Sequence, residues 1–218
     1  MQVLETTTLR VSEIFFSLQG ETSRIGLPTV FIRLTGCPLR CSYCDTAYAF
    51  TGGGSISIST ILDQLAHYQS KYVTVTGGEP LAQKACLVLL TALCEAQYSV
   101  SLETSGALEL SEVDSRVCKV MDIKTPGSGV VAKNLWSNLI HLLPHNQIKF
   151  VICNYADYEW AKQKMIDHQL IQYCQLLFSP SYQQIDAREL ADWIIRDRLQ
   201  VRLQIQLHKY LWGDVPGK

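Results

Sequence analysis

Short β-rich segments alternate with helical patterns along this chain, and this alternation restricts the folds that it can adopt. Runs of about four to seven residues that are rich in β-branched and aromatic side chains predict strands. They lie at 30–34, 72–76, 99–103, 117–123, 147–153, 175–179 and 201–207. Apolar residues at helical spacing predict helices between several of these strands, at 60–69, 83–97, 134–143, 157–168 and 186–197. Such alternation implies βαβ units and a mainly parallel sheet.

The length of the chain limits how far such a sheet can close. A complete eight-stranded barrel typically needs about 250 residues, whereas this chain has 218. We therefore expect an α/β fold with a partial, open TIM-like barrel of about six parallel strands and few covering helices. No internal repeat, low-complexity segment or linker interrupts the pattern, so a single domain over residues 1–218 is expected.

Composition excludes several classes of partner. The formal net charge is -1, and no run rich in Lys or Arg offers a surface for polyanions, so nucleic acid is not an expected partner. No stretch of about 18 apolar residues is present, and the amino terminus has no basic segment followed by an apolar core, so we expect neither a membrane span nor export. The reducing cytoplasm is the expected location, because the eight cysteines show no disulfide framework.

Three cysteines, Cys37, Cys41 and Cys44, lie within eight residues directly after the first predicted parallel strand. Soft thiolates select zinc, copper(I) or iron–sulfur clusters. A structural zinc site needs a fourth ligand, and no second cysteine pair follows at the usual distance. A cubane cluster held at three corners would instead leave one iron open for chemistry. The remaining cysteines occur singly in apolar or alternating segments and are expected to behave as small buried hydrophobes. They are Cys86, Cys94, Cys118, Cys153 and Cys174.

Other polar residues follow the ends of the predicted strands, where the active sites of parallel α/β folds collect. Gly77, Gly78, Glu79 and Pro80 follow the second strand. Paired glycines let a backbone approach a ligand closely, and Glu79 can accept a hydrogen bond from an ammonium group. The same four residues are also compatible with an ordinary strand-to-helix turn that has Pro80 near the first helical position.

The spacing Cys-x3-Cys-x2-Cys, with an aromatic residue before the last cysteine, resembles the signature of the radical S-adenosylmethionine (SAM) enzymes. In these enzymes SAM chelates the open iron of a 4Fe-4S cluster. The Gly-Gly-Glu-Pro segment, about 30 residues further on, is similar to their second hallmark. A glycyl-radical-enzyme activating enzyme would share the cysteine loop, although it usually carries a second cysteine cluster that this chain lacks. A zinc-stabilised interaction module is the other alternative, and one colourless zinc per chain would identify it.

Segments on both sides of the cysteines resemble one family, the 7-carboxy-7-deazaguanine synthases. They are residues 12–21, 26–34, 44–46, 76–80, 103–106 and 206–209. The resemblance implies conversion of 6-carboxy-5,6,7,8-tetrahydropterin to 7-carboxy-7-deazaguanine with loss of ammonia, on the route to queuosine and related deazapurines. It implies a radical ring contraction in which SAM is a reusable cofactor.

The resemblance also implies residue roles. Glu21, Arg33 and His208 are the candidate catalytic residues: Glu21 would pair with the donor edge of the aminopyrimidine ring, Arg33 would bind the substrate carboxylate, and His208 would reach the substrate. Thr46 would ligate Mg²⁺ beside that carboxylate. Other expected substrate contacts come from Leu18, Gln19, Gly20 and Thr76.

The expected SAM contacts come from five segments. They are Tyr43, Cys44 and Asp45; Gly78 and Glu79; Ser105; Asp122, Ile123 and Lys124; and Ser179, Pro180, Ser181 and Tyr182. Many relatives carry Ser-Pro-Lys where this chain has Asp122-Ile123-Lys124. In relatives the terminal carboxylate meets the substrate, but the tail at 210–218 is expected to be longer here, so no contact is carried over for it. A one-electron reductant such as flavodoxin, and a homodimer, are the partners that the resemblance implies.

Overall fold

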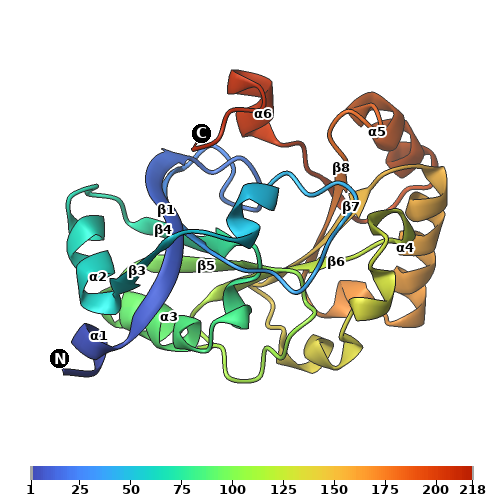
Figure 1. Cartoon of the computed structure of the whole chain (residues 1–218). Coiled ribbons are helices and arrows are strands. Elements are labelled where there is room, and N and C mark those ends of the chain that lie inside the picture. Colours follow the sequence, from blue (N-terminus) through green and yellow to red (C-terminus); the bar gives the residue numbers. More distant parts are fainter. Residues whose placement is uncertain (1, 218) are drawn as a thin grey trace.

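The computed structural model describes residues 2–217 and has one sheet of nine strands in the order β3-β1-β2-β4-β5-β6-β7-β8-β9. The strands are β1 (Thr8–Leu18), β2 (Pro28–Leu34), β3 (Gly54–Ser57), β4 (Tyr72–Gly77), β5 (Ser99–Thr104), β6 (Cys118–Ile123), β7 (Gln147–Ile152), β8 (Gln175–Pro180) and β9 (Arg202–Leu203). From β2 onward along the sheet, each neighbouring pair is parallel, whereas β1 is antiparallel to both β2 and β3. The predicted open, mainly parallel sheet is therefore confirmed (Figure 1).

Helices cover the outer face of this curved sheet. They are α1 (Gln2–Thr6), α2 (Ile58–Ala66), α3 (Ala85–Glu95), α4 (Tyr155–Asp167) and α5 (Ala187–Arg196), while the short α6 (Leu207–Trp212) lies apart from them, at the top of Figure 1. Ser57, Asn154 and Asp186 cap α2, α4 and α5, each with a side-chain oxygen that accepts a backbone N–H of the first turn. None of the helices within the described residues is long and apolar enough to cross a membrane.

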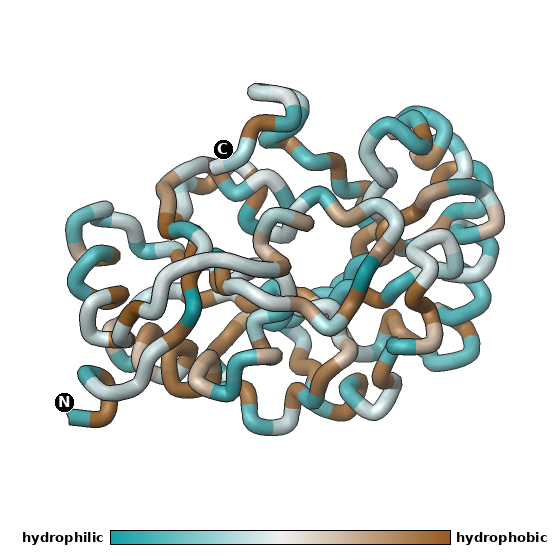
Figure 2. Tube along the Cα trace, viewed as in Figure 1, coloured by the Kyte–Doolittle hydropathy of each residue, from teal (hydrophilic) through white to brown (hydrophobic). Residues whose placement is uncertain are grey.

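The core lies between the sheet and the helices. Ile32, Val75, Leu102 and Ile148, from the parallel strands β2, β4, β5 and β7, are fully buried, as is Leu90 of α3. Figure 2 shows the hydrophobic residues gathered along these inner segments and the hydrophilic ones on the outer turns of the helices. A parallel sheet covered by helices needs such nearly continuous apolar strands, because the side chains on its outer face must be buried.

Two predicted elements differ in the structure. The predicted helix at 134–143 is instead a loop with 3₁₀ turns at Val131–Lys133 and Trp136–His141. Asn134 bonds both backbone groups of Lys124, and Asn138 bonds the backbone of Gly106, Leu108 and Leu110. These side chains pair with distant backbone, which holds the segment as a connection rather than a regular helix. The predicted strand at 201–207 shortens to β9, since residues 204–206 have no regular structure and residues from Leu207 onward form α6.

Candidate active site

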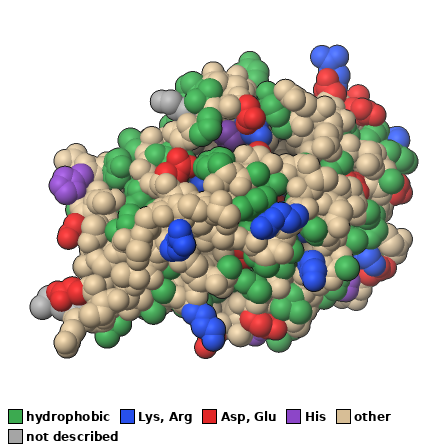
Figure 3. All heavy atoms as spheres, in the orientation of Figure 1, with side chains coloured by type: hydrophobic (Ala, Val, Ile, Leu, Met, Phe, Trp, Pro, Cys, Tyr) green, Lys and Arg blue, Asp and Glu red, His purple; other side chains and the backbone are tan. Residues whose placement is uncertain are grey.

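A cavity of about 690 Å³ opens at the carboxyl ends of the parallel strands. Basic, acidic and histidine side chains gather at a hollow beneath the segment that carries α6 (Figure 3). Nearly all the residues singled out from the sequence line this one cavity, although they are spread over almost 200 positions. They are Leu18, Gln19, Gly20, Glu21, Arg33, Cys37, Cys41, Tyr43, Cys44, Asp45, Thr46, Thr76, Gly78, Ser105, Asp122, Lys124, Ser179, Pro180, Ser181, Tyr182 and His208.

The loop that follows β2 presents the three cysteines to the cavity as free thiols, each partly exposed. Ser42 anchors this loop, since its backbone N–H and its hydroxyl donate to the carbonyls of Ser128 and Gly127, at 3.0 and 2.6 Å. Within residues 2–217, no three Cys, His, Asp or Glu side chains are arranged around the position of a single metal ion. A cluster with several irons does not need its thiols to meet at one point, because each thiol binds a different iron. Thus the three cysteines can hold a 4Fe-4S cluster.

Gly78 brings the end of β4 against the cysteine loop. A Cβ atom at Gly78 would collide with the carbonyl of Gly36 and lie 2.8 Å from the Cβ of Cys37. Gly77, with φ of +146°, would likewise meet the backbone of Leu34. This turn therefore requires glycine at both positions, and its backbone borders the cavity beside the cysteines.

Two predicted cofactor residues, Glu79 and Ile123, lie outside the cavity lining. Glu79 is fully buried, and its carboxylate accepts from the hydroxyl of Thr104, from the backbone and hydroxyl of Ser105, and from the backbone of Leu81. These protein donors use the carboxylate that was expected to meet an ammonium group, so we assign Glu79 to holding the loop after β5. Ile123 packs in the core at 3% exposure, because alternate residues of β6 face opposite sides of the sheet.

Tyr43, Asp122 and Lys124 form one end of the cavity, together with the Ser179–Tyr182 turn. Lys124 donates to Asp122 Oδ2 at 2.8 Å, but Asp122 Oδ1 and the Tyr43 hydroxyl are buried and have no partner among the described residues. Buried polar atoms are seldom left unpaired unless a ligand or water completes them. SAM carries an ammonium group and ribose hydroxyls that could donate to such atoms. This end of the cavity therefore fits SAM beside the cysteines.

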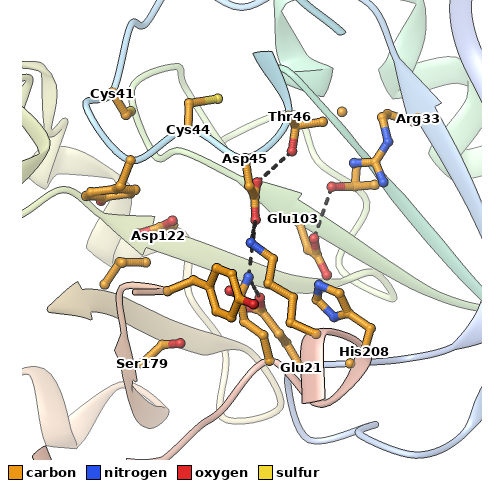
Figure 4. A pocket seen from close by; sticks show the side chains of 18 of the residues that line it. Glu21, Arg33, Cys41, Cys44, Asp45, Thr46, Glu103, Asp122, Ser179 and His208 are labelled. Atoms are coloured by element: carbon orange, nitrogen blue, oxygen red, sulfur yellow. Dashed lines mark hydrogen bonds and ion pairs between the residues drawn. The ribbon is translucent and has the colours of Figure 1, made fainter. Parts of the chain in front are cut away.

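Arg33 lies at the opposite end of the cavity (Figure 4). The register of β1 against β2 places Glu13 opposite Arg33, and the Nε of Arg33 donates to Glu13 at 2.6 Å. Tyr48 donates to the same carboxylate oxygen at 2.8 Å. The two terminal nitrogens of the guanidinium make no hydrogen bond within the part of the chain that the structure describes. Arg33 is thus held through Nε, with its planar fork free for a carboxylate ligand.

In Figure 4, Glu103 and His208 lie on the same side of the cavity as Arg33, Asp122 and Ser179 lie on the side of Cys41, and Glu21 lies below Asp45. Glu103 accepts from Gln19 at 3.3 Å and from Thr76 at 3.0 Å. Burial raises the pKa of Glu103, and the nearby charge of Glu21 adds to this rise.

His208 lies against Gly20, where a Cβ atom would overlap Nδ1 of the imidazole. Burial lowers the pKa of His208, so its neutral form is favoured. The site is therefore rich in acceptors that suit the donor edge of a planar heterocycle, and it has one neutral imidazole.

Asp45 lies between the two ends of the cavity (Figure 4). It accepts from the hydroxyl of Thr46 at 2.8 Å, from Gln206 at 3.2 Å and from Lys209 at 3.1 Å. Burial opposes its charge, but Lys209 and these hydrogen bonds hold the pKa of Asp45 well below its usual range. Thr46 lines the cavity, and its hydroxyl bonds Asp45 and makes no capping bond to the 3₁₀ turn that follows it.

Several cavity residues were missed from the sequence. They are Lys149, Gln206, Lys209 and the tail residues 214–217. Glu13, which holds Arg33 from outside the lining, was also given no role, and Glu103 was noted only as a strand end within a family-like segment. Lys149 had a visible signal, since it is a cation at an alternate position of an otherwise apolar strand. Gln206 and Lys209 lie in the family-like segment 206–209, but only His208 was given a role there, because their contacts depend on the chain returning to the cavity after β9.

An open parallel sheet that carries three cysteines at its carboxyl edge is the architecture of a radical SAM enzyme, and the family model described as Radical SAM superfamily matches residues 31–119. Curated 7-carboxy-7-deazaguanine synthases match nearly the whole chain. The one from Chlorobaculum tepidum is 44% identical over 94% of both chains, and the one from Koribacter versatilis is 39% identical over 94% of this chain and 97% of its own. The crystal structure of QueE from Escherichia coli matches with a TM-score of 0.79 at 24% identity, and covers 95% of this chain and 97% of that one.

The chain therefore belongs to the 7-carboxy-7-deazaguanine synthase family of radical SAM enzymes. Its cofactors are accordingly a 4Fe-4S cluster and SAM. This finding confirms the family expected from the sequence, and it sets aside the zinc-stabilised module and the glycyl-radical activating enzyme.

Proposed function

We propose that this enzyme converts 6-carboxy-5,6,7,8-tetrahydropterin to 7-carboxy-7-deazaguanine and ammonia, for the synthesis of queuosine and related deazapurines. The observation that carries this proposal is one cavity with two chemically different ends. Three cysteines, the Gly-Gly turn and unpaired polar atoms form one end, while Arg33, Glu21 and His208 form the other. A carboxylated heterocycle that donates hydrogen bonds from one edge matches the second end.

The residues of the chain bind and orient this substrate. Arg33 holds the carboxylate with its terminal nitrogens, and Glu21 accepts from the aminopyrimidine donors, so the pterin is fixed at two opposite sides. His208 packs on Gly20 and closes the ring edge next to Glu21. When bound, the cluster and SAM supply the radical that removes hydrogen from the substrate. The carboxylate and ring contacts hold the pterin in one orientation while its ring contracts, which keeps the reacting atoms in place.

Thr46 is the proposed protein ligand of a Mg²⁺ ion beside the substrate carboxylate. Its hydroxyl lines the cavity, and the Asp45 carboxylate adds negative charge next to it. Mg²⁺ commonly keeps several waters and takes few protein oxygens, so one hydroxyl with substrate oxygens suits it. The ion would act as a template that orients the carboxylate.

A direct assay tests the proposed reaction. The protein is reconstituted anaerobically with iron and sulfide, then incubated with SAM, Mg²⁺, a reductant and the carboxytetrahydropterin. The expected result is 7-carboxy-7-deazaguanine and ammonia in equal amounts, with SAM not consumed in proportion. A fully loaded protein that cleaves SAM but leaves the pterin unchanged would contradict the proposed substrate.

The remaining partners are also proposals. A one-electron reductant such as flavodoxin can approach the cysteine loop, where Arg40 and Ser42 are exposed. We expect turnover with reduced flavodoxin in place of a chemical reductant. We also propose a homodimer that acts in the cytoplasm, with each copy a single domain. The exposed apolar surface of α6 at Tyr210 and Leu211 supports an interface. Light scattering at the mass of one chain would contradict the dimer.

A further inference from the structure

Lys149 is a buried cation on the inner face of the sheet. It lies on β7 opposite Asp122 of β6, and its side chain is only 14% exposed. Its neighbours in the strand, Ile148 and Phe150, point into the core, so the alternation of β7 directs Lys149 into the cavity. A buried ammonium group is costly unless acidic partners compensate for the lost hydration. Lys149 therefore requires acidic partners within the cavity.

The two acidic partners of Lys149 lie at different distances from it. Its Nζ lies 2.6 Å from Glu21 Oε2 and 4.0 Å from Asp122 Oδ2. Asp122 already has its own cation, since Lys124 donates to the same oxygen at 2.8 Å. Burial alone would lower the pKa of Lys149, but Glu21, Asp122 and Glu103 together raise it above the usual value, so the side chain stays charged. Lys149 is thus the specific counter-ion of Glu21.

Without this lysine, Glu21 would lose its ion-pair partner, and Glu103 would keep only the weaker influence of the Arg33 charge. Among residues 2–217, Glu103 accepts only from the neutral Gln19 and Thr76, and the second oxygen of Glu21 accepts from the neutral Gln206 at 2.8 Å. Burial raises the pKa of Glu21, but the charge and hydrogen bond of Lys149 reverse this and leave that pKa below its usual value. The ionised state and the direction of Glu21 both depend on Lys149.

We propose that Lys149 is a positioning residue for the substrate, which acts by holding Glu21 as an ionised, correctly directed acceptor for the amino edge of the pterin. This inference rests on the proposed function. Each carboxylate oxygen has a second lone pair, so Glu21 can accept from the substrate while it remains bonded to Lys149 and Gln206. Lys149 itself need not touch the substrate.

The test compares Lys149→Met with Lys119→Met as a matched control. Lys119 is also a buried lysine on an adjacent strand, but it bonds the carbonyl of His141 and does not line the cavity. In Lys149→Met we expect the KM for the pterin to rise at least about tenfold, because a charge-assisted acceptor is lost. The Kd for SAM and the cluster absorbance should change less than about twofold, since Asp122 keeps Lys124. Lys119→Met should keep the wild-type KM.

A pH profile separates positioning from packing. In Lys149→Met the pKa of Glu21 rises, because burial and the nearby Glu103 and Asp45 carboxylates then act on it with no adjacent cation. His208 also faces Glu21, and the charges of Glu21 and Lys149 act on its pKa in opposite directions. The ratio of kcat/KM for the variant to that for the wild type should therefore increase as the pH rises from about 6 to about 8.5. Lys149→Arg, which retains the charge, should show no such increase.

The outcomes distinguish this inference from the proposed function. If the wild type and Lys119→Met do not convert the pterin, the proposed function fails. If they convert it and Lys149→Met does so with an unchanged KM and a flat ratio across pH, only the role of Lys149 is overturned. Should Lys149→Met not fold, Lys149→Gln replaces it. The glutamine keeps a donor without the charge, so the same rise in KM is expected, and a wild-type KM would refute the proposal.

Discussion

At the residue scale, surroundings rather than chemistry separate the three loop cysteines from the other five. Cys41 lines the cavity and is partly exposed, whereas Cys86 is fully buried in the core and its thiol pKa is raised strongly by burial. We expect Cys41→Ala to lose the cluster and all SAM cleavage. Cys86→Ala should cost about 1–2 kcal/mol of unfolding free energy and retain the cluster. Visible absorbance measures the cluster and 5′-deoxyadenosine formation measures SAM cleavage in both variants, and their unfolding curves give the change in stability. A Cys41→Ala protein that keeps full absorbance would contradict the ligand assignment.

Arg33 tests the substrate carboxylate contact. Lysine keeps the charge but cannot present two parallel donors, so Arg33→Lys should lose about 2–3 kcal/mol in kcat/KM for the carboxylated pterin. Cluster content and the Kd for SAM should stay at wild-type values. Arg10→Lys is the matched control, because Arg10 lies on neighbouring β1 and bonds the carbonyl of Gly52 outside the cavity. Unchanged pterin kinetics in Arg33→Lys would make Arg33 a partner of Glu13 alone.

Thr46 tests the magnesium site. Turnover of the wild type should rise with Mg²⁺, and Thr46→Ala should shift the half-maximal Mg²⁺ concentration upward by roughly tenfold without loss of the cluster, because one oxygen ligand is removed. Steady-state rates across a Mg²⁺ titration give the shift. Thr51→Ala serves as control, since Thr51 is exposed and does not line the cavity. The same Mg²⁺ curve in all three proteins would leave Thr46 as a partner of Asp45 only.

At the element scale, the Gly-Gly turn after β4 positions the cysteine loop. Gly78→Ala would force a Cβ atom into Gly36 and Cys37, so we expect a loss of about 1–3 kcal/mol in stability and a reduced cluster content. Gly54→Ala is the control, because a Cβ atom there meets nothing within 4 Å. Thermal unfolding of both variants, with iron content after reconstitution, provides the measurement. If Gly78→Ala and Gly54→Ala were equally stable, the cysteine loop would shift to accept the Cβ atom without loss of stability.

The elements that the sequence predicted well are those with strong local patterns. The six long parallel strands have nearly continuous apolar runs, and helices α2 to α5 have apolar residues that pack on the sheet. A parallel sheet that is covered by helices needs both kinds of pattern. The 134–143 segment was predicted as a helix because local spacing does not reveal that Asn134 and Asn138 bond distant backbone. Strand β1 was not predicted at all, although its pairing with β2 is what brings Glu13 to Arg33.

At the scale of the whole molecule, the site is closed by parts of the chain that are far apart in sequence. Residues with a motif, such as the cysteines and Arg33, could be placed in the site from the sequence alone. Lys149 stood out as a cation in a mainly apolar strand, but its role could not be predicted, because its partner Glu21 lies 128 positions away. The carboxyl-terminal segment was left without a role, yet residues 214–217 line the cavity and Lys209 links them to Asp45, through Asp214 at 3.5 Å.

This arrangement predicts that the tail is a wall of the active site and not a part of the core. A chain that ends at Gly213 should fold, because Val215 is half exposed and the tail adds no residue to the core cluster. We expect the Tm to fall by no more than about 4 °C. Water and oxygen would then reach the substrate more easily, so the pterin KM and the 5′-deoxyadenosine released per product should both rise.

Deletion of residues 2–6 is the matched control for this truncation. These residues form α1, which has no buried residue and does not contribute to the cavity. The shortened amino terminus should keep the wild-type KM and the wild-type ratio of 5′-deoxyadenosine to product, because it leaves the cavity wall intact. If the chain that ends at Gly213 shows the same two values as this control, the tail does not shield the reaction, and closure of the cavity must depend on α6 and Lys209 alone.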